Sequence, residues 1–306
     1  MSKVLITGGT GLLGKALTKK LLSAGHPVVL LSRSAKSSSV PGVSTFTWNV
    51  NKGEMDPEAL HGVEYVVHLA GSGIAEHRWT DAVKQEVLAS RIKSMQLLES
   101  EIRKQGIRLK AFTGGSAVGY YGMVTSDHMF KEDDKPVTSD FLVQCCRAWE
   151  NTYVRANEFS ERHCVIRIGV VLSKDGGALK RMVPLFQWGL GSPIGSGRQY
   201  MPWIHIDDMS EILFQSLFNP AMQGIYNAAS PEPVRNREFS KQLAKALRRP
   251  FIAPAVPAFV LRAMFGEMGN VVLEGSAVDV KRLLEAGFVF QYPSLEKALA
   301  YELNRP

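Results

Sequence analysis

The residues with the clearest chemistry are the glycines that follow the first apolar run of the chain. Val4–Thr7 predicts a short strand that leads directly into Gly8-Gly9-Thr10-Gly11-Leu12-Leu13-Gly14. Gly9, Gly11 and Gly14 satisfy the G-x-G-x-x-G spacing, in which glycines allow a tight turn and a close backbone approach to a pyrophosphate. The pyrophosphate then meets the free N–H groups of the next helix. We predict dinucleotide binding rather than a purely structural turn, with contacts from Gly8, Thr10, Gly11, Leu12, Leu13 and Gly14.

The end of the second expected strand distinguishes between two dinucleotides. NAD sites usually carry Asp or Glu there to hold the ribose 2′-hydroxyl, whereas this chain has Ser32-Arg33-Ser34 and no acidic residue before Glu54. A 2′-phosphate beside Arg33 gains charge-assisted hydrogen bonds worth about 1.5–3 kcal/mol. That energy corresponds to about a 10- to 150-fold preference for NADP. The alternative is an arginine that is merely solvated at a strand end.

An alternation of short β-branched runs and helical patterns must position these residues. The expected strands are Lys3–Thr7, Pro27–Ser32, Ser44–Trp48, Tyr65–Leu69, Leu109–Gly114, His163–Ile168 and a last one at Gly224–Ala228. Strand–helix–strand alternation implies a parallel sheet with helices on both faces. We therefore expect an α/β protein with a Rossmann-type doubly wound parallel sheet and a smaller C-terminal substrate lobe.

The composition and the hydrophobic pattern of the sequence change after Ile168. Residues 173–202 are rich in Gly, Pro and aromatic residues, which predicts irregular structure, and the tail from Pro231 returns to helical patterning that the stretch Pro250–Pro257 interrupts. We assign residues 1–172, with a returning strand at 224–228, to an NADP-binding Rossmann domain. Residues 173–223 and 229–306 form the expected substrate-side lobe.

Composition narrows the function classes. The chain has 306 residues, 45% hydrophobic and 21% charged, as in ordinary globular enzymes. Its net charge of +7 comes from dispersed Lys and Arg with no run of five, so we expect no nucleic-acid partner. No apolar run reaches membrane-spanning length and no histidine spacing suits a metal, so we expect neither a membrane partner nor a metal. The three cysteines form no disulfide framework, and a cytoplasmic location is expected.

Several further segments resemble the extended short-chain dehydrogenase/reductases. They are Val67-His68-Leu69-Ala70-Gly71, Arg167-Ile168-Gly169-Val170-Val171-Leu172, Trp203-Ile204-His205-Ile206-Asp207-Asp208 and Ile225-Tyr226-Asn227. The match is sharpest to the atypical, nucleoside-diphosphate-sugar-epimerase-like subgroup, through Gly115-Ser116-Ala117-Val118-Gly119-Tyr120-Tyr121-Gly122, Cys146-Arg147-Ala148-Trp149-Glu150, Gly195-Ser196-Gly197-Arg198-Gln199 and Arg282-Leu283-Leu284-Glu285-Ala286-Gly287-Phe288.

The resemblance implies further contacts with NADP(H). Ser32 and Arg33 would hold the 2′-phosphate, and Val170 would lie against the nicotinamide. In a helix beginning near Trp79, Glu86 and Arg91 match cofactor-contacting positions, although surface charges five residues apart are the alternative. The backbone that passes the nicotinamide-side ribose would be Leu69, Ala70 and Gly71.

The departure from the family is the missing Tyr-x-x-x-Lys pair, in which the lysine lowers the pKa of a proton-transferring tyrosine. No tyrosine of this chain has a lysine four residues later; Cys146 and Glu150 occupy the two places. A carboxylate raises the pKa of a neighbouring thiol, which is the opposite effect. The usual mechanism therefore cannot be carried over to this chain.

Other residues could still carry chemistry. By resemblance Ser116 would polarise a substrate carbonyl or hydroxyl, and Tyr120 or Tyr121 would supply the proton; the alternative is that they only shape a pocket. Arg198, in the loop 189–199, offers a donor fork to an anionic group. His205 and Asp207 lie two apart on an expected extended segment, either as a proton relay or as a structural hydrogen bond.

Two functions remain open. The first is an NADP(H)-dependent oxidoreductase or epimerase that acts on a small polar or nucleotide-linked substrate. The second is a degenerate relative that binds NADP(H) without turnover, as a sensor or scaffold. The resemblance also implies a homodimer, by analogy with extended members of the family.

Overall fold

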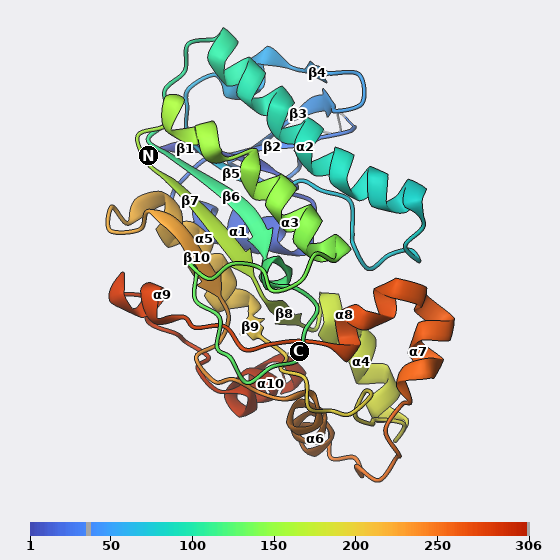
Figure 1. Cartoon of the computed structure of the whole chain (residues 1–306). Helices are drawn as coiled ribbons and strands as arrows, with labels where there is room; N and C mark the ends of the chain where they lie inside the picture. Colours follow the sequence, from blue (N-terminus) through green and yellow to red (C-terminus); the bar gives the residue numbers. More distant parts are fainter. Residues whose placement is uncertain (35–37, 305–306) are drawn as a thin grey trace.

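A computed structural model describes residues 1–34 and 38–304 (Figure 1). Its centre is an eight-stranded sheet with the strand order β10-β7-β6-β5-β1-β2-β3-β4. All neighbouring pairs are parallel except the short antiparallel pair β3–β4. The strands are β1 (Lys3–Thr7), β2 (Val28–Ser32), β3 (Val43–Asn49), β4 (Glu54–Met55), β5 (Val63–His68), β6 (Ala111–Ala117), β7 (His163–Ile168) and β10 (Gly224–Ala228).

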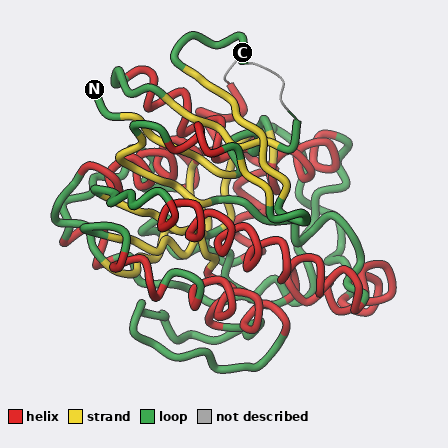
Figure 2. The backbone as a smooth tube through the Cα atoms, turned by 90° about the horizontal axis from the view of Figure 1, so that it is seen from above, coloured by secondary structure: helices red, strands yellow, loops and turns green. Residues whose placement is uncertain are grey.

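Helices cover both faces of the sheet, as Figure 2 shows from above. On one face α1 (Leu12–Ser23) and α5 (Ile206–Phe218) pack on Val4 and Ile6 of β1. On the other, α2 (Asp81–Lys104) and α3 (Phe141–Asn151) pack on the cluster that contains Leu5. Because successive side chains of a strand point to opposite faces, a strand buried on both sides has a continuous apolar run, as Val4–Ile6 in β1. The predicted Rossmann-type doubly wound sheet is confirmed.

All seven predicted strands are present, and their observed ends differ from the expected ones by at most three residues. Four short 3₁₀ helices, Pro57–Leu60, Val118–Tyr121, Val154–Glu158 and Gly266–Gly269, complete the connections among the described residues. Within the described part of the chain, no helix combines the length and the apolar character that crossing a membrane requires.

The smaller C-terminal lobe is built on a two-stranded parallel sheet of β8 (Val170–Ser173) and β9 (Trp203–His205). A third cluster, which includes Leu172, Trp203, Phe239 and Leu299, forms its core. The helices of this lobe are α4 (Gly177–Gln187), α6 (Asn236–Ala246), α7 (Ala258–Phe265), α8 (Asn270–Leu273), α9 (Lys281–Glu285) and α10 (Leu295–Asn304). The predicted return to helical structure in the tail is confirmed.

The prediction of irregular structure over residues 173–202 was wrong for its first half, where α4 runs from Gly177 to Gln187. Leu179 and Phe186 are seven residues apart and both are buried on the inner face of this helix. Gly176, Gly177 and the internal Pro184 obscured that spacing in the sequence.

The expected extended segment from His205 to Asp207 was also wrong, because β9 ends at His205 and α5 begins at Ile206. His205 is the N-cap of α5, and its Nδ1 accepts a hydrogen bond from the backbone N–H of Asp207 at 3.1 Å. A side chain that accepts from the first turn of a helix stabilises its start.

Candidate functional site

The glycine turn joins β1 to α1 with no room for side chains at two positions. Gly8 has a φ of +71°, and a Cβ there would lie 2.7 Å from the carbonyl oxygen of Leu69. A Cβ on Gly14 would lie 2.5 Å from the Gly8 oxygen. Glycine is therefore required for the turn and for the close packing of α1 on β1.

The start of α1 faces this turn without a side-chain cap. Its N-cap is Gly11, and no side chain accepts a hydrogen bond from the first turn. Uncapped N–H groups and the positive end of the helix dipole suit an anion such as a pyrophosphate. The residues present therefore fit the dinucleotide that the sequence predicts.

The end of β5 lies directly beside the glycine turn. The hydroxyl oxygen of Thr7 accepts hydrogen bonds from the N–H groups of Leu69 and Ala70, both at 3.1 Å. A Cβ on Gly71 would meet the Arg91 guanidinium at 3.0 Å. The structure thus places the segment from Leu69 to Gly71 beside the glycine turn.

Arg91 and Glu86 of α2 both reach the segment after Gly71. Nη1 of Arg91 donates to the carbonyls of Ser72 (3.1 Å) and Val87 (2.9 Å), and the guanidinium stacks on Trp149 at 4.7 Å. Arg91 is buried, its Nε has no partner, and it forms no ion pair within the described residues. A buried cation without a counter-ion is costly, so this position suits a negatively charged ligand.

Glu86 contributes from the more exposed side of the same helix. Its Oε1 accepts a hydrogen bond from the Ser72 hydroxyl at 3.1 Å. Glu86 and Arg91, which could have been unrelated surface charges, therefore contact one segment at the carboxyl end of β5.

Ser32, Arg33, Thr10 and Val170 complete the predicted cofactor positions. Ser32 ends β2, whose residue Leu31 pairs with Thr7 of β1, so Arg33 emerges at the same sheet edge as the glycine turn. Arg33 and Thr10 are exposed, and Arg33 forms no ion pair with a described residue. Val170 begins β8 beyond that edge and its N–H donates to the Pro202 carbonyl at 2.7 Å.

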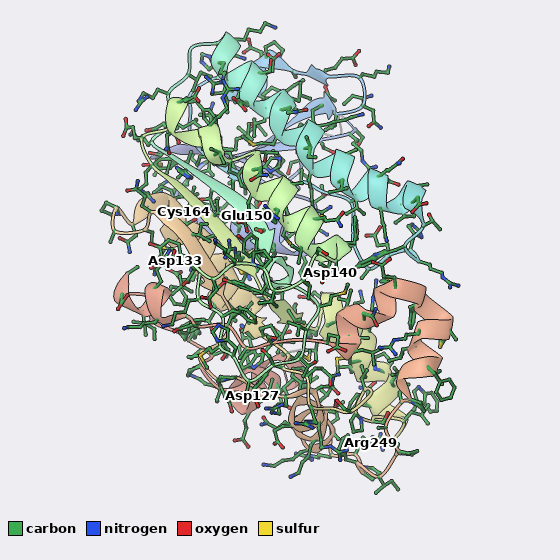
Figure 3. All side chains as sticks on the ribbon, in the orientation of Figure 1. Asp127, Asp133, Asp140, Glu150, Cys164 and Arg249 are labelled. Carbon is green, nitrogen blue, oxygen red and sulfur yellow. The ribbon has the colours of Figure 1, made fainter. Side chains whose placement is uncertain are left out.

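A buried polar group lies next to this cradle, at the end of β6. The Ser116 hydroxyl donates to Oε1 of Glu150 at 2.7 Å. Arg167 of β7 donates hydrogen bonds to both oxygens of the same carboxylate, from Nε to Oε1 and from Nη2 to Oε2, each at 2.9 Å. This two-point geometry is the strongest that arginine offers a carboxylate. Figure 3 labels Glu150 on α3, beside the strands of the sheet.

Arg167 continues the network toward the other strands. Its Nη1 donates to the Tyr121 hydroxyl and to the Glu132 carbonyl, both at 3.0 Å, and its guanidinium lies 3.4 Å from the centre of the Tyr120 ring. The Tyr121 hydroxyl donates in turn to Oδ1 of Asn227 at 2.7 Å. The network therefore joins β6, β7, β10 and α3.

Tyr121 is fully engaged in this network. It is buried, and burial raises the pKa of its hydroxyl to about 12. Ser116 and Tyr121, the two predicted catalytic residues, belong to one network, but Tyr121 meets Ser116 only through Arg167 and Glu150. Arg167 and Asn227 were not predicted as site residues, although both lie in segments that carry the resemblance.

Cys146, which stands in the place of the family's tyrosine, is closed off from solvent. It is buried, and burial together with neighbouring Cys145 and Glu150 raises the pKa of its thiol to about 12. The neutral thiol agrees with the expectation that a carboxylate beside it opposes proton transfer.

His205 and Asp207 are arranged as a structural pair. Nε2 of His205 lies 3.1 Å from Oε1 of Glu302, and both side chains are fully buried. The Asp207 carboxylate lies 3.7 Å from Nδ1, and its side chain is 41% exposed. This geometry favours the structural alternative, in which His205 anchors α10 to β9, over a proton relay.

Arg198 lines an open polar pocket of about 330 Å³, together with Thr125, Ser126, Asp127, Ser196 and Arg235. Arg235 donates to the Asp127 carboxylate and to the Tyr200 hydroxyl, whereas Arg198 forms no ion pair with a described residue. A free guanidinium at the rim of a polar pocket suits an anionic group of a ligand.

Among the residues that the structure describes, no group of three or more His, Cys, Asp and Glu side chains could hold a metal ion.

Comparison with known proteins gives consistent matches over the whole length. The family model described as the NAD dependent epimerase/dehydratase family matches residues 4–229, and a domain of unknown function matches residues 256–302. The chloroplastic homologue of epimerase family protein SDR39U1 from Arabidopsis thaliana is 38% identical over 300 residues, which are 97% of this chain and 85% of that protein.

Two solved structures are also similar. The human epimerase family protein SDR39U1 (isoform 2) with NADPH superposes with a TM-score of 0.87 at 34% identity, covering 99% of this chain and 100% of that one. The nucleoside-diphosphate sugar epimerase from Corynebacterium glutamicum superposes with a TM-score of 0.79 at 28% identity, covering 99% of this chain and 58% of that one.

Proposed function

The chain belongs to the NAD-dependent epimerase/dehydratase family, and from that premise we propose that it binds NADP(H) and works as an oxidoreductase or epimerase on a small polar or nucleotide-linked substrate. The crystal structure of the human relative with NADPH supports the choice of cofactor. The Arg198 pocket supports a substrate that carries an anionic group.

The cofactor would be held along the carboxyl edge of the sheet. The uncapped start of α1 takes the pyrophosphate, Arg33 takes the 2′-phosphate, and the Leu69–Gly71 backbone takes the far ribose. Arg91 supplies the positive charge beside Gly71. When bound, NADP(H) supplies the hydride donor or acceptor, and proton transfer is left to the chain.

The observation that carries the proposal is the 2.7 Å hydrogen bond from Ser116 to Glu150. In the oxidative direction the Ser116 oxygen accepts the proton of a substrate hydroxyl, while its own proton moves to Oε1 of Glu150. Arg167 positions the carboxylate so that Oε1 receives that proton. The reverse direction returns both protons along the same path, and it needs Glu150 protonated.

One observation favours the second candidate, a protein that binds NADP(H) without turnover. Arg167 is buried and neutralises Glu150, and Cys146 holds its proton. A saturated ion pair of this kind can be purely structural.

Two measurements test the proposal. A thermal-shift titration should give a larger stabilisation with NADPH than with NADH, and Arg33→Ala should remove most of the difference. Equal shifts with both cofactors, or an Arg33→Ala variant that keeps its preference, would contradict the cofactor assignment.

Absorbance of NADPH against a panel of carbonyl compounds, and of NADP⁺ against the matching alcohols, tests turnover. We expect Glu150→Gln and Ser116→Ala each to lower kcat by about 10²- to 10⁴-fold with unchanged NADPH affinity. Tyr121→Phe should keep most of the activity, because the Tyr121 hydroxyl accepts a hydrogen bond from Arg167, donates one to Asn227 and does not reach Ser116. Cofactor binding with flat absorbance across the panel would favour the non-catalytic candidate.

A further inference from the structure

The surface of the C-terminal lobe carries an apolar helix that the fold does not bury. α7 has the sequence Ala-Phe-Val-Leu-Arg-Ala-Met-Phe, and none of its residues is buried. Phe259 is 72% exposed and Met264 is also exposed. A helix this apolar usually packs its side chains into a core, so α7 presents an apolar face that no described residue of the chain buries.

The end of α4 extends this face. Trp188 is 83% exposed, and Leu185 and Leu190 are exposed beside it in the chain. Ile194, after α4, pairs with Val256, before α7, through hydrogen bonds of the Pro193–Gly195 backbone at 2.9 Å. This pairing places the chain after α4 alongside the chain that leads into α7, which carries the exposed Ile252. Figure 1 shows α4 and α7 in the same lower right part of the molecule.

The two segments that form this region are rich in positive charge. Residues 177–206 and 239–266 contain eight Lys and Arg and no Asp or Glu, in a chain with 29 acidic residues. Glu267, directly after the second segment, pairs with Lys84. Lys180, Arg248, Arg249 and Arg262 form no ion pair within the described residues. Figure 3 labels Arg249 at the lower right extremity of the molecule, in the loop that leads toward α7.

We propose that this basic apolar surface, formed by Leu185, Trp188, Leu190, Ile252, Phe259 and Met264 with Lys180, Arg248, Arg249 and Arg262 at its border, docks on the headgroup region of an anionic lipid bilayer. Exposed Trp and Phe side chains partition into the boundary between headgroups and acyl chains, and flanking Lys and Arg are attracted to anionic lipids. The proposal goes beyond the cofactor chemistry and does not depend on it.

The same features disfavour other occupants. A second copy of the chain would bring two cationic surfaces face to face, which repel. A nucleic acid would satisfy the charges and could stack on Trp188 and Phe259, but it would leave the aliphatic side chains of Leu185, Leu190, Ile252 and Met264 without an apolar partner. The expectation of no membrane partner rested on the lack of a spanning run, and adhesion to one leaflet needs no such run.

The chain carries its own reporter for the test. Of the five tryptophans, Trp48, Trp79, Trp149 and Trp203 are buried, and only Trp188 is exposed. Mixing the full chain with phosphatidylcholine vesicles that contain phosphatidylglycerol should shift its tryptophan emission to the blue and carry the protein with floating vesicles. Vesicles of phosphatidylcholine alone should do neither.

Variants separate the apolar from the electrostatic contribution. Phe259→Glu should abolish flotation, and the Lys180→Glu/Arg249→Glu pair should weaken binding by about tenfold or more, since each cation near an anionic surface contributes about 1 kcal/mol. The matched controls are Val289→Glu, at an exposed valine elsewhere, and the exposed pair Lys52→Glu/Lys93→Glu, which should leave binding unchanged.

Other results would overturn the proposal. An emission shift that grows with protein concentration in the absence of vesicles would assign the surface to a second copy. A shift with an oligonucleotide but not with anionic vesicles would assign it to nucleic acid. Equal loss of flotation in the control variants, or no flotation of the wild type, would remove the bilayer as the occupant.

Discussion

Glu150 shows how a single residue changes the chemistry of a familiar arrangement. It stands where family enzymes carry a lysine, yet its carboxylate accepts hydrogen bonds from the Ser116 hydroxyl and from the Arg167 guanidinium. A carboxylate in this place is a proton acceptor, whereas the lysine acts by lowering the pKa of a tyrosine. The exchange moves the candidate acid–base group from a phenol to a serine–carboxylate pair.

Gly8→Ala should remove cofactor binding and destabilise the fold. The substitution forces a residue with a Cβ into a left-handed conformation, which costs about 1–2 kcal/mol, and it adds a clash with the Leu69 carbonyl. Gly53→Ala is the control, because Gly53 has a similar φ of +68° and open space around its Cβ position. Urea unfolding and NADPH titration of both variants measure the difference. Equal losses would show that the close approach at Gly8 does not matter.

His68 should make the fold sensitive to acid. It is buried between the Tyr153 hydroxyl (3.1 Å) and the Ser94 hydroxyl (3.0 Å), and burial, assisted by Arg91, lowers its pKa from 6.5 to about 3. The unfolded chain therefore binds the extra proton between pH 6.5 and 3, so the stabilisation is complete above 6.5 and is lost as the pH falls. The loss is about 1.4 kcal/mol per pH unit.

Urea unfolding of the wild type and of His68→Gln, compared from pH 7 down to pH 5, measures this contribution. The wild type should lose stability more steeply, because glutamine does not titrate. Parallel curves for the two proteins would contradict the assignment of the acid sensitivity to His68.

At the scale of elements, α3 positions the site because its start is fixed. The Asp140 carboxylate accepts from the N–H groups of Leu142 (2.9 Å) and Val143 (3.1 Å), and also from that of Met123 (2.8 Å). Figure 3 labels Asp140 at one end of this helix and Glu150 along it. A cap at one end therefore sets the angle at which Glu150 reaches Ser116.

Asp140→Ala should lower the free energy of unfolding by about 0.5–2 kcal/mol from the lost cap, and it should also lower turnover by displacing Glu150. Asp140→Asn keeps an acceptor and should recover most of both losses. Asp56→Ala removes the cap of a 3₁₀ helix remote from α3 and should affect stability alone. Thermal unfolding and the NADPH assay give the two readouts, and an Asp140→Ala variant with full turnover would contradict the positioning role.

The strands were predictable from the sequence and α4 was not, for a physical reason. A strand buried on both faces is a continuous apolar run, as in Val4–Ile6, and such runs are visible without any partner. The helical spacing of Leu179 and Phe186 lies among Gly176, Gly177 and Pro184, residues that favour other structure. Only packing in the lobe overrides those local preferences.

At the scale of the whole molecule, the site is assembled from distant segments. The glycine turn could be read locally, because its residues are contiguous. Arg167 and Asn227 come from the strands β7 and β10, and Tyr121 comes from the 3₁₀ helix that follows β6. These segments become neighbours only in the finished sheet, so their hydrogen bonds could not be derived from spacing. The role of Glu150 was equally invisible, since its partners lie 34 and 17 residues away.

Glu302→Ala should destabilise the lobe strongly. The Glu302 carboxylate is buried against His205 and accepts from the Lys174 backbone at 2.6 Å, so it ties α10 to β8 and β9. Removing one partner of a buried pair costs about 3–5 kcal/mol. Glu296→Ala on the exposed side of α10 should cost less than about 1 kcal/mol, and urea unfolding compares the two. Similar losses would show that α10 is held by its apolar contacts alone.

The burial of the three cysteines has a consequence for oxidative chemistry. Burial raises the pKa of all three thiols: that of Cys146 to about 12, that of Cys164 to about 11, and that of Cys145 above its usual value. All three therefore remain protonated thiols at neutral pH. Peroxide and disulfide exchange attack through the exposed thiolate. The folded chain therefore offers neither peroxide nor a disulfide a reactive cysteine thiolate, so its cysteines resist oxidation and disulfide exchange while the fold is intact.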